Sequence, residues 1–157
     1  MFRWYTLSIA VIIFDQITKY YAVQKLILHE VRGIYSGFNL KLIYNEGAAF
    51  SFLSDAGGWQ RWFLIGISCL VSLFVVVWMY RSLSKSRCLL LGLSLILGGA
   101  LGNLWDRLSL GYVVDFIEFY YKDLYWPAFN IADSAITIGA ILLILDTFLA
   151  DDSKTPS

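Results

Sequence analysis

The residues most able to do chemistry lie in three short segments in the second half of the chain. The segments are Gly98–Arg107, Val113–Phe116 and Phe129–Ser134. They carry Asp106, Asp115 and Asp133 inside or against strongly apolar sequence. A charged side chain in hydrocarbon costs roughly 2.5–3.5 kcal/mol even on the most lenient insertion scale. A chain that keeps several such groups close together is expected to use them.

Asp115 and Asp133 are the best candidates for a catalytic pair. They are too far apart in sequence to share a helical turn, so they meet only if the elements around them bring two ends together. Two neighbouring carboxyl groups in a partly desolvated site do not both ionise easily, so one of them keeps its proton. Such a pair can activate water against a peptide carbonyl without a metal ion. The alternative is that these acids only cap helix ends and form ion pairs.

Several other polar residues could support such a pair. Asn103 and Asn130 could hold the carboxylates or the substrate backbone, and Arg107 could pair with Asp106 to fix a helix end. Asn130 is also a candidate helix N-cap.

Asp15 and Lys19 are four residues apart and share a helix face, with the acid first. Asp15 either forms an internal ion pair with Lys19 or faces the polar site, and the spacing does not decide between them.

Composition indicates an integral membrane protein. Hydrophobic residues make up 59% of the 157 residues, charged residues 15%, and the mean hydropathy is +0.66. The length fits one domain, which we place at residues 1–150, followed by a polar tail at 151–157. A net charge of zero argues against a nucleic-acid partner. The two cysteines and one histidine match no metal-site spacing, so no cofactor is predicted.

Four segments are long enough to cross a bilayer, and each is expected to be a helix, although the first contains Asp15, Gln16 and Lys19. They are Trp4–Val23, Trp62–Tyr80, Cys88–Trp105 and Ile131–Leu149. The first is expected to be retained rather than removed as a signal peptide. Gly98 and Gly102 in the third segment predict close contact with another helix.

Two segments between the helices favour strands. Residues 38–44 alternate, with Phe38, Leu40, Leu42 and Tyr44 predicted on one face and Ile43 as the apolar exception on the other. Gly111–Phe129 is aromatic and β-prone. Open strand edges do not occur in lipid, so both segments are expected at the interface or in water.

Asn45–Ser51 interrupts the first strand-like segment with a turn. Gly47 is predicted there for a positive φ angle or a close backbone approach. An extended peptide could add to this edge, and Phe50 could help to line a slot for acyl chains.

Basic residues predict the orientation of the chain. Four spans place both termini on the same side of the membrane. Arg81–Arg87 has three basic residues and no acid, and Arg3 lies near the N-terminus. The positive-inside rule therefore predicts both termini in the cytoplasm and the strand-like segments outside.

The sequence resembles the lipoprotein signal peptidases (signal peptidase II) over nearly its whole length. The resemblance rests on Asp15-Gln16 with Lys19, on Asn45–Ser51, and on the three segments described first. It implies a mainly α-helical membrane protein with four transmembrane helices and a small extracytoplasmic β cradle. It also implies a metal-independent aspartic endopeptidase that removes the signal peptide of bacterial prolipoproteins before a diacylglyceryl-modified cysteine.

The resemblance also suggests roles for individual residues. Asp115 and Asp133 match the family's catalytic aspartates, and the supporting positions fall on Asp15, Asn45, Asn103, Arg107 and Asn130. The expected partners are a lipidated prolipoprotein and membrane phospholipid. The protein is expected to be a monomer of the bacterial inner membrane. Trp105 is bulkier than expected and could narrow the lipid groove.

Two alternatives remain open from the sequence. A small proton-coupled transporter or channel component would also use intramembrane acids, although the acids here gather at one interface. An inactive scaffold that binds lipidated peptides would carry the same residues.

Overall fold

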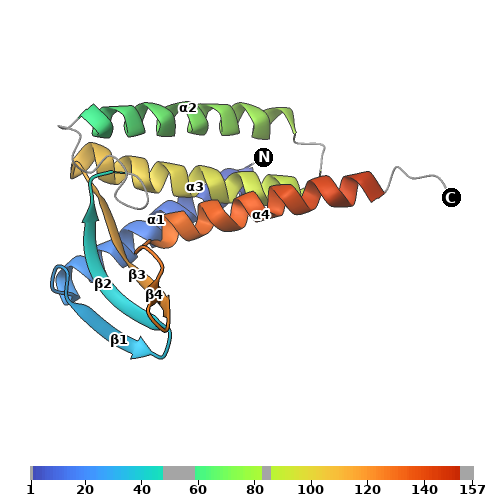
Figure 1. Cartoon of the computed structure of the whole chain (residues 1–157). Coiled ribbons are helices and arrows are strands. Elements are labelled where there is room, and N and C mark those ends of the chain that lie inside the picture. The colour runs from blue at the N-terminus through green and yellow to red at the C-terminus, as the bar shows by residue number, and fades with distance from the viewer. Residues whose placement is uncertain (1, 48–58, 83–85, 153–157) are drawn as a thin grey trace.

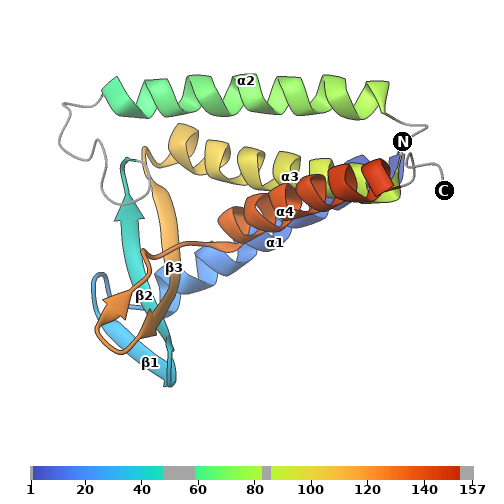
Figure 2. The ribbon, with the colours of Figure 1, turned by 45° about the vertical axis from the view of Figure 1, so that its right-hand side comes forward.

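A computed structural model describes residues 2–47, 59–82 and 86–152. The elements follow in the order α1 (Phe2–Lys25), β1 (Val31–Tyr35), β2 (Phe38–Asn45), α2 (Trp59–Arg81), α3 (Arg87–Ser109), β3 (Val113–Tyr121), β4 (Leu124–Tyr125) and α4 (Ile131–Asp152). Four long helices run side by side, and one small sheet lies at one end of them (Figure 1). The first residues of α1 and the last residues of α4 lie at the end of the helices that is opposite the sheet (Figure 2).

Helix α3 is the centre of the helical layer, because α1, α2 and α4 all pack against it. Glycines allow the close approaches. A Cβ atom on Gly98 would lie 2.7 Å from the Cβ of Val11 in α1, and one on Gly92 would lie 2.8 Å from the carbonyl oxygen of Gly139 in α4. Gly102 meets the Asp15 carboxylate. The predicted packing role of Gly98 and Gly102 is therefore confirmed, whereas the Gly92–Gly139 contact was not predicted.

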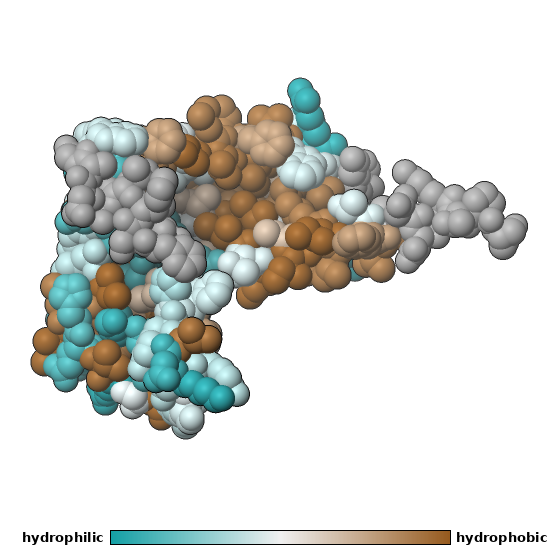
Figure 3. Space-filling view, in the orientation of Figure 1, coloured by the Kyte–Doolittle hydropathy of each residue, from teal (hydrophilic) through white to brown (hydrophobic). Residues whose placement is uncertain are grey.

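Among the residues that the structure describes, three helices are long and apolar enough to cross a membrane: α2, α3 and residues Ile131–Leu149 of α4. On the face shown in Figure 3, brown, apolar residues predominate along the middle of the helices, and teal, hydrophilic residues lie among brown ones over the sheet. Helix α1 has 24 residues, which is sufficient length, but it carries Asp15 and Lys19 on its buried face. Three of the four predicted spans are thus confirmed as helices of sufficient length and apolarity, and the spanning role of α1 stays a prediction. Helix α4 also continues to Asp152, into the segment predicted as a polar tail.

The sheet is antiparallel with strand order β1-β2-β3-β4. Both strand predictions are confirmed, but the predicted alternation in β2 is wrong beyond Leu40. Leu40 pairs with Ile117 and Ile43 pairs with Asp115, so β2 has one extra residue between these two pairs. Such a bulge moves all later side chains to the other face of the strand.

The bulge in β2 positions the site. It places Asn45 opposite Val113, on the same face of the sheet as Asp115. Without the extra residue, Tyr44 would take that place. The sheet is tied to the helices by the pairing of Ile117 with Phe129, just before α4 begins.

Candidate active site

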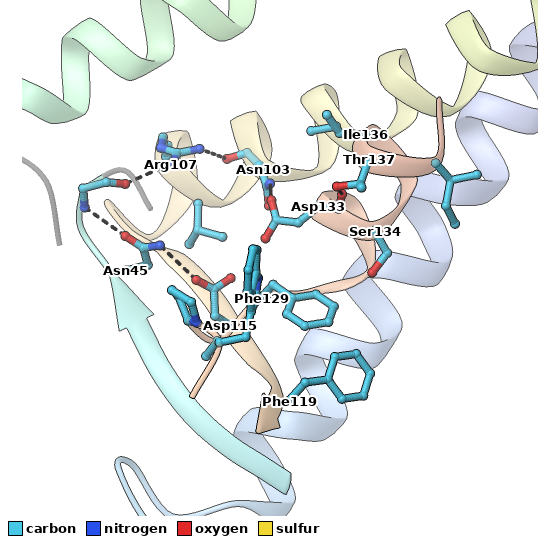
Figure 4. Close-up of a pocket in the computed structure, with 16 residues that line it drawn as sticks. Asn45, Asn103, Arg107, Asp115, Phe119, Phe129, Asp133, Ser134, Ile136 and Thr137 are labelled. Atoms are coloured by element: carbon cyan, nitrogen blue, oxygen red, sulfur yellow. Dashed lines mark hydrogen bonds between the residues drawn. The ribbon is translucent and has the colours of Figure 1, made fainter. Parts of the chain in front are cut away.

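A cavity of about 810 Å³ lies where α3, α4, β2 and β3 meet. Its polar lining comprises Asn45, Asn103, Arg107, Asp115, Asp133, Ser134 and Thr137. Large apolar side chains also line it, namely Phe119, Trp126, Phe129, Ile136 and Ile138. Figure 4 shows that the polar side chains converge from different elements, while Phe119 and Phe129 lie on the other side. The cavity thus brings together the two predicted aspartates and four of the residues predicted to support them or bind substrate, namely Asn45, Gly47, Asn103 and Arg107.

Asp115 reaches the cavity from β3 and is only 2% exposed. Its carboxyl oxygens accept hydrogen bonds from Asn45 Nδ2 at 2.9 Å and from Asn130 Nδ2 at 2.6 Å. Burial, followed by the negative charge of Asp133, raises the pKa of Asp115 to about 7. Asp115 therefore keeps its proton at pH values where an exposed aspartate has lost it.

Asp133 is in the first turn of α4 and forms a capping box with Asn130. The backbone N–H of Asp133 donates to Asn130 Oδ1 at 2.9 Å, and the backbone N–H of Asn130 donates to Asp133 Oδ2 at 3.3 Å. Asn103 Nδ2 donates to Asp133 Oδ1 at 2.7 Å. Asp133 is thus a helix-capping residue and a cavity-lining carboxylate at once, so the capping alternative is correct without excluding the other. The predicted N-cap role of Asn130 is confirmed.

Asn130 connects the two aspartates and is fully buried. Its Oδ1 is engaged by the N–H of Asp133, so its Nδ2 is left to donate to Asp115 Oδ1 and to Asn103 Oδ1. The two asparagines therefore present donors to both carboxylates. This arrangement suits carboxylates that share one proton, because amide donors stabilise the charged one without supplying a countercharge.

Arg107 lines the cavity, but not in the way predicted. Its Nη2 donates to the carbonyl oxygen of Gly47 at 3.4 Å and its Nη1 to that of Asn103 at 3.5 Å. The predicted pairing of Arg107 with Asp106 is wrong: Asp106 pairs with Lys19 instead, at 2.8 Å. Consecutive helical residues point about 100° apart, because a turn takes 3.6 residues. Asp106 faces α1 for this reason, while Arg107 faces the cavity.

Asp15 lies beneath the cavity and does not line it. The ion-pair interpretation of Asp15 is confirmed, since its Oδ2 pairs with Lys19 at 2.8 Å. Asp15 is linked to the site only through the backbone, because its Oδ1 accepts the N–H of Ala132 at 2.9 Å, next to Asp133. Sequence reasoning missed Asp106 as a second partner of Lys19. The spacing of these residues along the chain carried no signal for that contact.

The remaining predictions concern the turn after β2 and Trp105. Gly47 lines the cavity and donates its N–H to Asn45 Oδ1 at 3.1 Å. The prediction for Gly47 is a positive φ angle or a close backbone approach. Positive φ angles among the described glycines occur at Gly37 and Gly111, whereas the Gly47 carbonyl oxygen accepts a hydrogen bond from Arg107 Nη2 at 3.4 Å. Phe50 lies outside the described residues. Trp105 is 60% exposed and is absent from the cavity lining, so it does not narrow this cavity.

Metal-ligating side chains do not gather in the described part of the chain. Within residues 2–47, 59–82 and 86–152, no group of three or more histidine, cysteine, aspartate or glutamate residues could hold a metal ion. The polar groups that line the cavity are two carboxyl groups, two asparagine amides, one guanidinium and the hydroxyl groups of Ser134 and Thr137.

Comparisons with known proteins agree on one family. The family model for signal peptidase (SPase) II matches residues 7–149. A lipoprotein signal peptidase from Teredinibacter turnerae is 53% identical over 145 residues, covering 92% of this chain and 86% of its own. One from Acinetobacter baumannii is 51% identical over 151 residues, covering 96% and 86%.

Solved structures give the same result. One bacterial membrane enzyme superimposes with a TM-score of 0.88 at 30% identity, over 100% of this chain and 94% of that one. A second superimposes with a TM-score of 0.79 at 31% identity, over 92% of both chains. With a matching family model, close relatives and a shared membrane-enzyme fold, this chain belongs to the signal peptidase II family, the lipoprotein signal peptidases.

Proposed function

We propose that Asp115 and Asp133 are the catalytic pair of an aspartic peptidase. The observation that carries the proposal is the placement of both carboxyl groups in one cavity, each held by asparagine amides, with the pKa of Asp115 at about 7. Asp115 then serves as the acid at neutral pH. Asp133, in the first turn of α4, has two N–H donors and the helix dipole to favour its charged form.

The proposed reaction needs only these two groups and water. Asp133 takes a proton from a water molecule, whose oxygen attacks the scissile carbonyl carbon, while Asp115 gives its proton to the carbonyl oxygen. The tetrahedral intermediate then breaks its C–N bond. The proton held by Asp133 passes to the leaving nitrogen, and the proton on the intermediate's hydroxyl returns to Asp115. No metal ion enters these steps, so we propose a metal-independent enzyme.

The proposed substrate is a lipidated prolipoprotein cut before its modified cysteine. Ile136 and Ile138 of α4, together with Phe119 and Phe129, give the cavity an apolar side that suits acyl chains. The polar side would receive the peptide. We propose that the chain acts as a single domain and a monomer surrounded by phospholipid, with α1 as a fourth spanning helix whose buried charges face the bundle.

The proposed orientation places the cavity outside the cytoplasm. Arg3, Arg81 and Arg87 belong to helix ends remote from the sheet (Figure 1). Because the positive-inside rule favours basic residues on the cytoplasmic side, this end would face the cytoplasm and the sheet would face outward.

The test is cleavage of a synthetic lipidated precursor by the purified protein in detergent. Asp115→Asn and Asp133→Asn should each lower kcat by about 10²–10⁴-fold while the variants keep the helical circular dichroism of the unchanged protein. Asp123→Asn, at an exposed acid in the turn after β3, is the matched control and should be fully active. Excess chelator should have no effect. Near-normal turnover of either cavity variant would contradict the catalytic pair, and activity lost to chelator and restored by zinc would contradict the metal-independent reaction.

The alternatives from the sequence find less support. No comparison supports a transporter or channel component. An inactive binding scaffold predicts that the lipidated precursor binds but stays intact in this assay.

A further inference from the structure

Three charged side chains form a buried cluster beneath the cavity. Lys19 Nζ is 2.8 Å from Asp15 Oδ2 and 2.8 Å from Asp106 Oδ2, and these three side chains are at most 4% exposed. None of the three lines the cavity. With one cation and two carboxylates, the cluster has a net charge of −1. Burying charges is costly even when they are paired and hydrogen-bonded, so we asked which groups the cluster holds in place.

Each carboxylate of the cluster accepts a hydrogen bond from the backbone N–H of the residue just before one of the cavity aspartates. Asp15 Oδ1 accepts the N–H of Ala132 at 2.9 Å, and Ala132 precedes Asp133. Asp106 Oδ2 accepts the N–H of Val114 at 3.1 Å, and Val114 precedes Asp115. Lys19 joins the two carboxylates. The backbone segments that present the aspartates are therefore held relative to each other by one ion cluster.

Lys19 has a third contact, with the Oδ1 of Asn103, which also accepts a hydrogen bond from Asn130 Nδ2 at 3.2 Å; the two donors together set the orientation of the Asn103 amide. Lys19 Nζ donates to Asn103 Oδ1 at 2.9 Å. An ammonium group has donors and no acceptor, so it requires the oxygen of the amide and not its nitrogen. Asn103 Nδ2 must then face the other way, where it donates to Asp133 Oδ1 at 2.7 Å (Figure 4). If the Asn103 amide were reversed, its NH₂ group would face the Lys19 ammonium and its oxygen would face the Asp133 carboxylate, and neither contact could be a hydrogen bond.

We propose that Lys19, held by Asp15 and Asp106, is a positioning residue that fixes the separation of Asp115 and Asp133 and keeps the Asn103 amide donating to Asp133. The inference rests on the proposed catalytic pair. It assigns to Lys19 an effect on turnover and none on substrate binding, because the cluster touches the backbone and Asn103 but not the cavity. Misplacement of catalytic groups by about 1 Å can cost about 100-fold in rate.

The test compares Lys19→Met with a matched control, Lys41→Met. Lys41 also pairs with a carboxylate, Glu118 at 3.1 Å, but on the sheet and away from the cavity. Lys19→Met should lower kcat about 100-fold with KM within about twofold, and Lys41→Met should leave both unchanged. A normal kcat for Lys19→Met, or an effect on KM alone, would overturn the inference.

A second variant covers the case in which Lys19→Met does not fold. Lys19→Met combined with Asp106→Asn leaves the cluster with its original net charge of −1, so it avoids two unpaired buried carboxylates. The folded double variant should still show the loss in kcat. Recovery of kcat to within about twofold of the unchanged protein would overturn the inference.

A double-mutant cycle tests the route through Asn103. In an Asn103→Ala background the donor to Asp133 is already absent, so Lys19→Met should cost clearly less there than in the unchanged protein. Equal losses in both backgrounds would mean that Lys19 acts independently of Asn103, which would overturn its orienting role.

Asp115→Asn, assayed in parallel, distinguishes failure of the proposed catalytic pair from failure of the proposed role of Lys19. Activity in Asp115→Asn would reject the catalytic pair. An inactive Asp115→Asn beside a fully active Lys19→Met would reject only the role of Lys19.

Discussion

Asn130 and Asp133 hold each other through two reciprocal hydrogen bonds, from each backbone N–H to the other's side chain, at 2.9 and 3.3 Å. This pair caps α4 and also decides which way the Asn130 amide points. Because Asn130 Oδ1 is engaged by the Asp133 N–H, the Nδ2 group faces Asp115 at 2.6 Å. The start of one helix is thereby coupled to the polar arrangement of the cavity.

Replacing Asn130 separates these two contributions. Asn130→Ser keeps an N-cap oxygen but removes the donor to Asp115, so it should lose about tenfold or more in kcat with a melting temperature close to that of the unchanged protein. Asn130→Ala should lose activity to a similar extent and also about 1 kcal/mol of stability, because the cap is gone. Cleavage rates and thermal melts of both variants check this. Equal melting temperatures for the serine and alanine variants would show that the cap contributes little.

Activity should fall as the pH rises above about 7. The pKa of Asp115 is raised to about 7 by burial and by the charge of Asp133, so Asp115 supplies a proton below that pH and has lost it above. On the alkaline side, kcat/KM should drop about tenfold per pH unit. A pH–rate profile in detergent measures this. A profile that stays flat from pH 7 to 9 would contradict the assignment of Asp115 as the acid.

The raised pKa of Asp115 should also make the folded protein less stable as the pH rises from 4 to 7. The unfolded chain loses the Asp115 proton near its ordinary value of 3.8, whereas the folded protein keeps it to about 7. Between these values the folded state binds more protons, so the contribution of Asp115 to stability is greatest at low pH and is lost as pH rises to 7. Asp115→Asn lacks this group. The melting temperature of the unchanged protein should therefore fall, relative to that of the variant, between pH 4 and 7; a constant difference would be the contrary result.

Changes in the turn after β2 should affect substrate handling more than folding. Asn45→Ala removes the donor to Asp115 and the acceptor for the Gly47 N–H, and Gly47→Val places bulk in the cavity lining. We expect each to lower kcat/KM about tenfold or more, with a smaller proportional change in stability. Cleavage assays and thermal melts decide this, and losses of similar size in both would mark the turn as scaffold.

The same assay tests the acyl-chain proposal. An unlipidated precursor should be a far poorer substrate than the lipidated one, because the apolar side of the cavity would stay unfilled. Comparable cleavage of the two precursors would remove the lipid from the recognition step.

Orientation can be tested in cells. A reporter fused after Ser157 should register the cytoplasm, and a cysteine introduced as Asp123→Cys should react with a membrane-impermeant thiol reagent added outside. The unchanged protein, which has Cys69 and Cys88 as its two cysteines, measures the background labelling. The reverse pattern would place the cavity on the cytoplasmic side.

The sequence by itself determined the helices, the strands and the identity of the polar residues. Apolar runs of sufficient length predict spanning helices whatever surrounds them, and the alternation in residues 38–44 predicts a strand. Asn130 ahead of the last apolar run predicted the helix start for a local reason, since a capping side chain contacts N–H groups only two or three residues away. These features depend on neighbours in the chain, so the chain sequence is enough.

Only the tertiary structure decided which polar groups meet. The bulge between Leu40 and Ile43 turns Asn45 to the face of Asp115, and that extra residue shows only when β2 pairs with β3. Asp106 pairs with Lys19, far away in sequence, because α1 packs closely against Gly98 and Gly102 of α3. Contacts between distant segments depend on register and helix rotation, and a single residue's shift in either redirects every side chain.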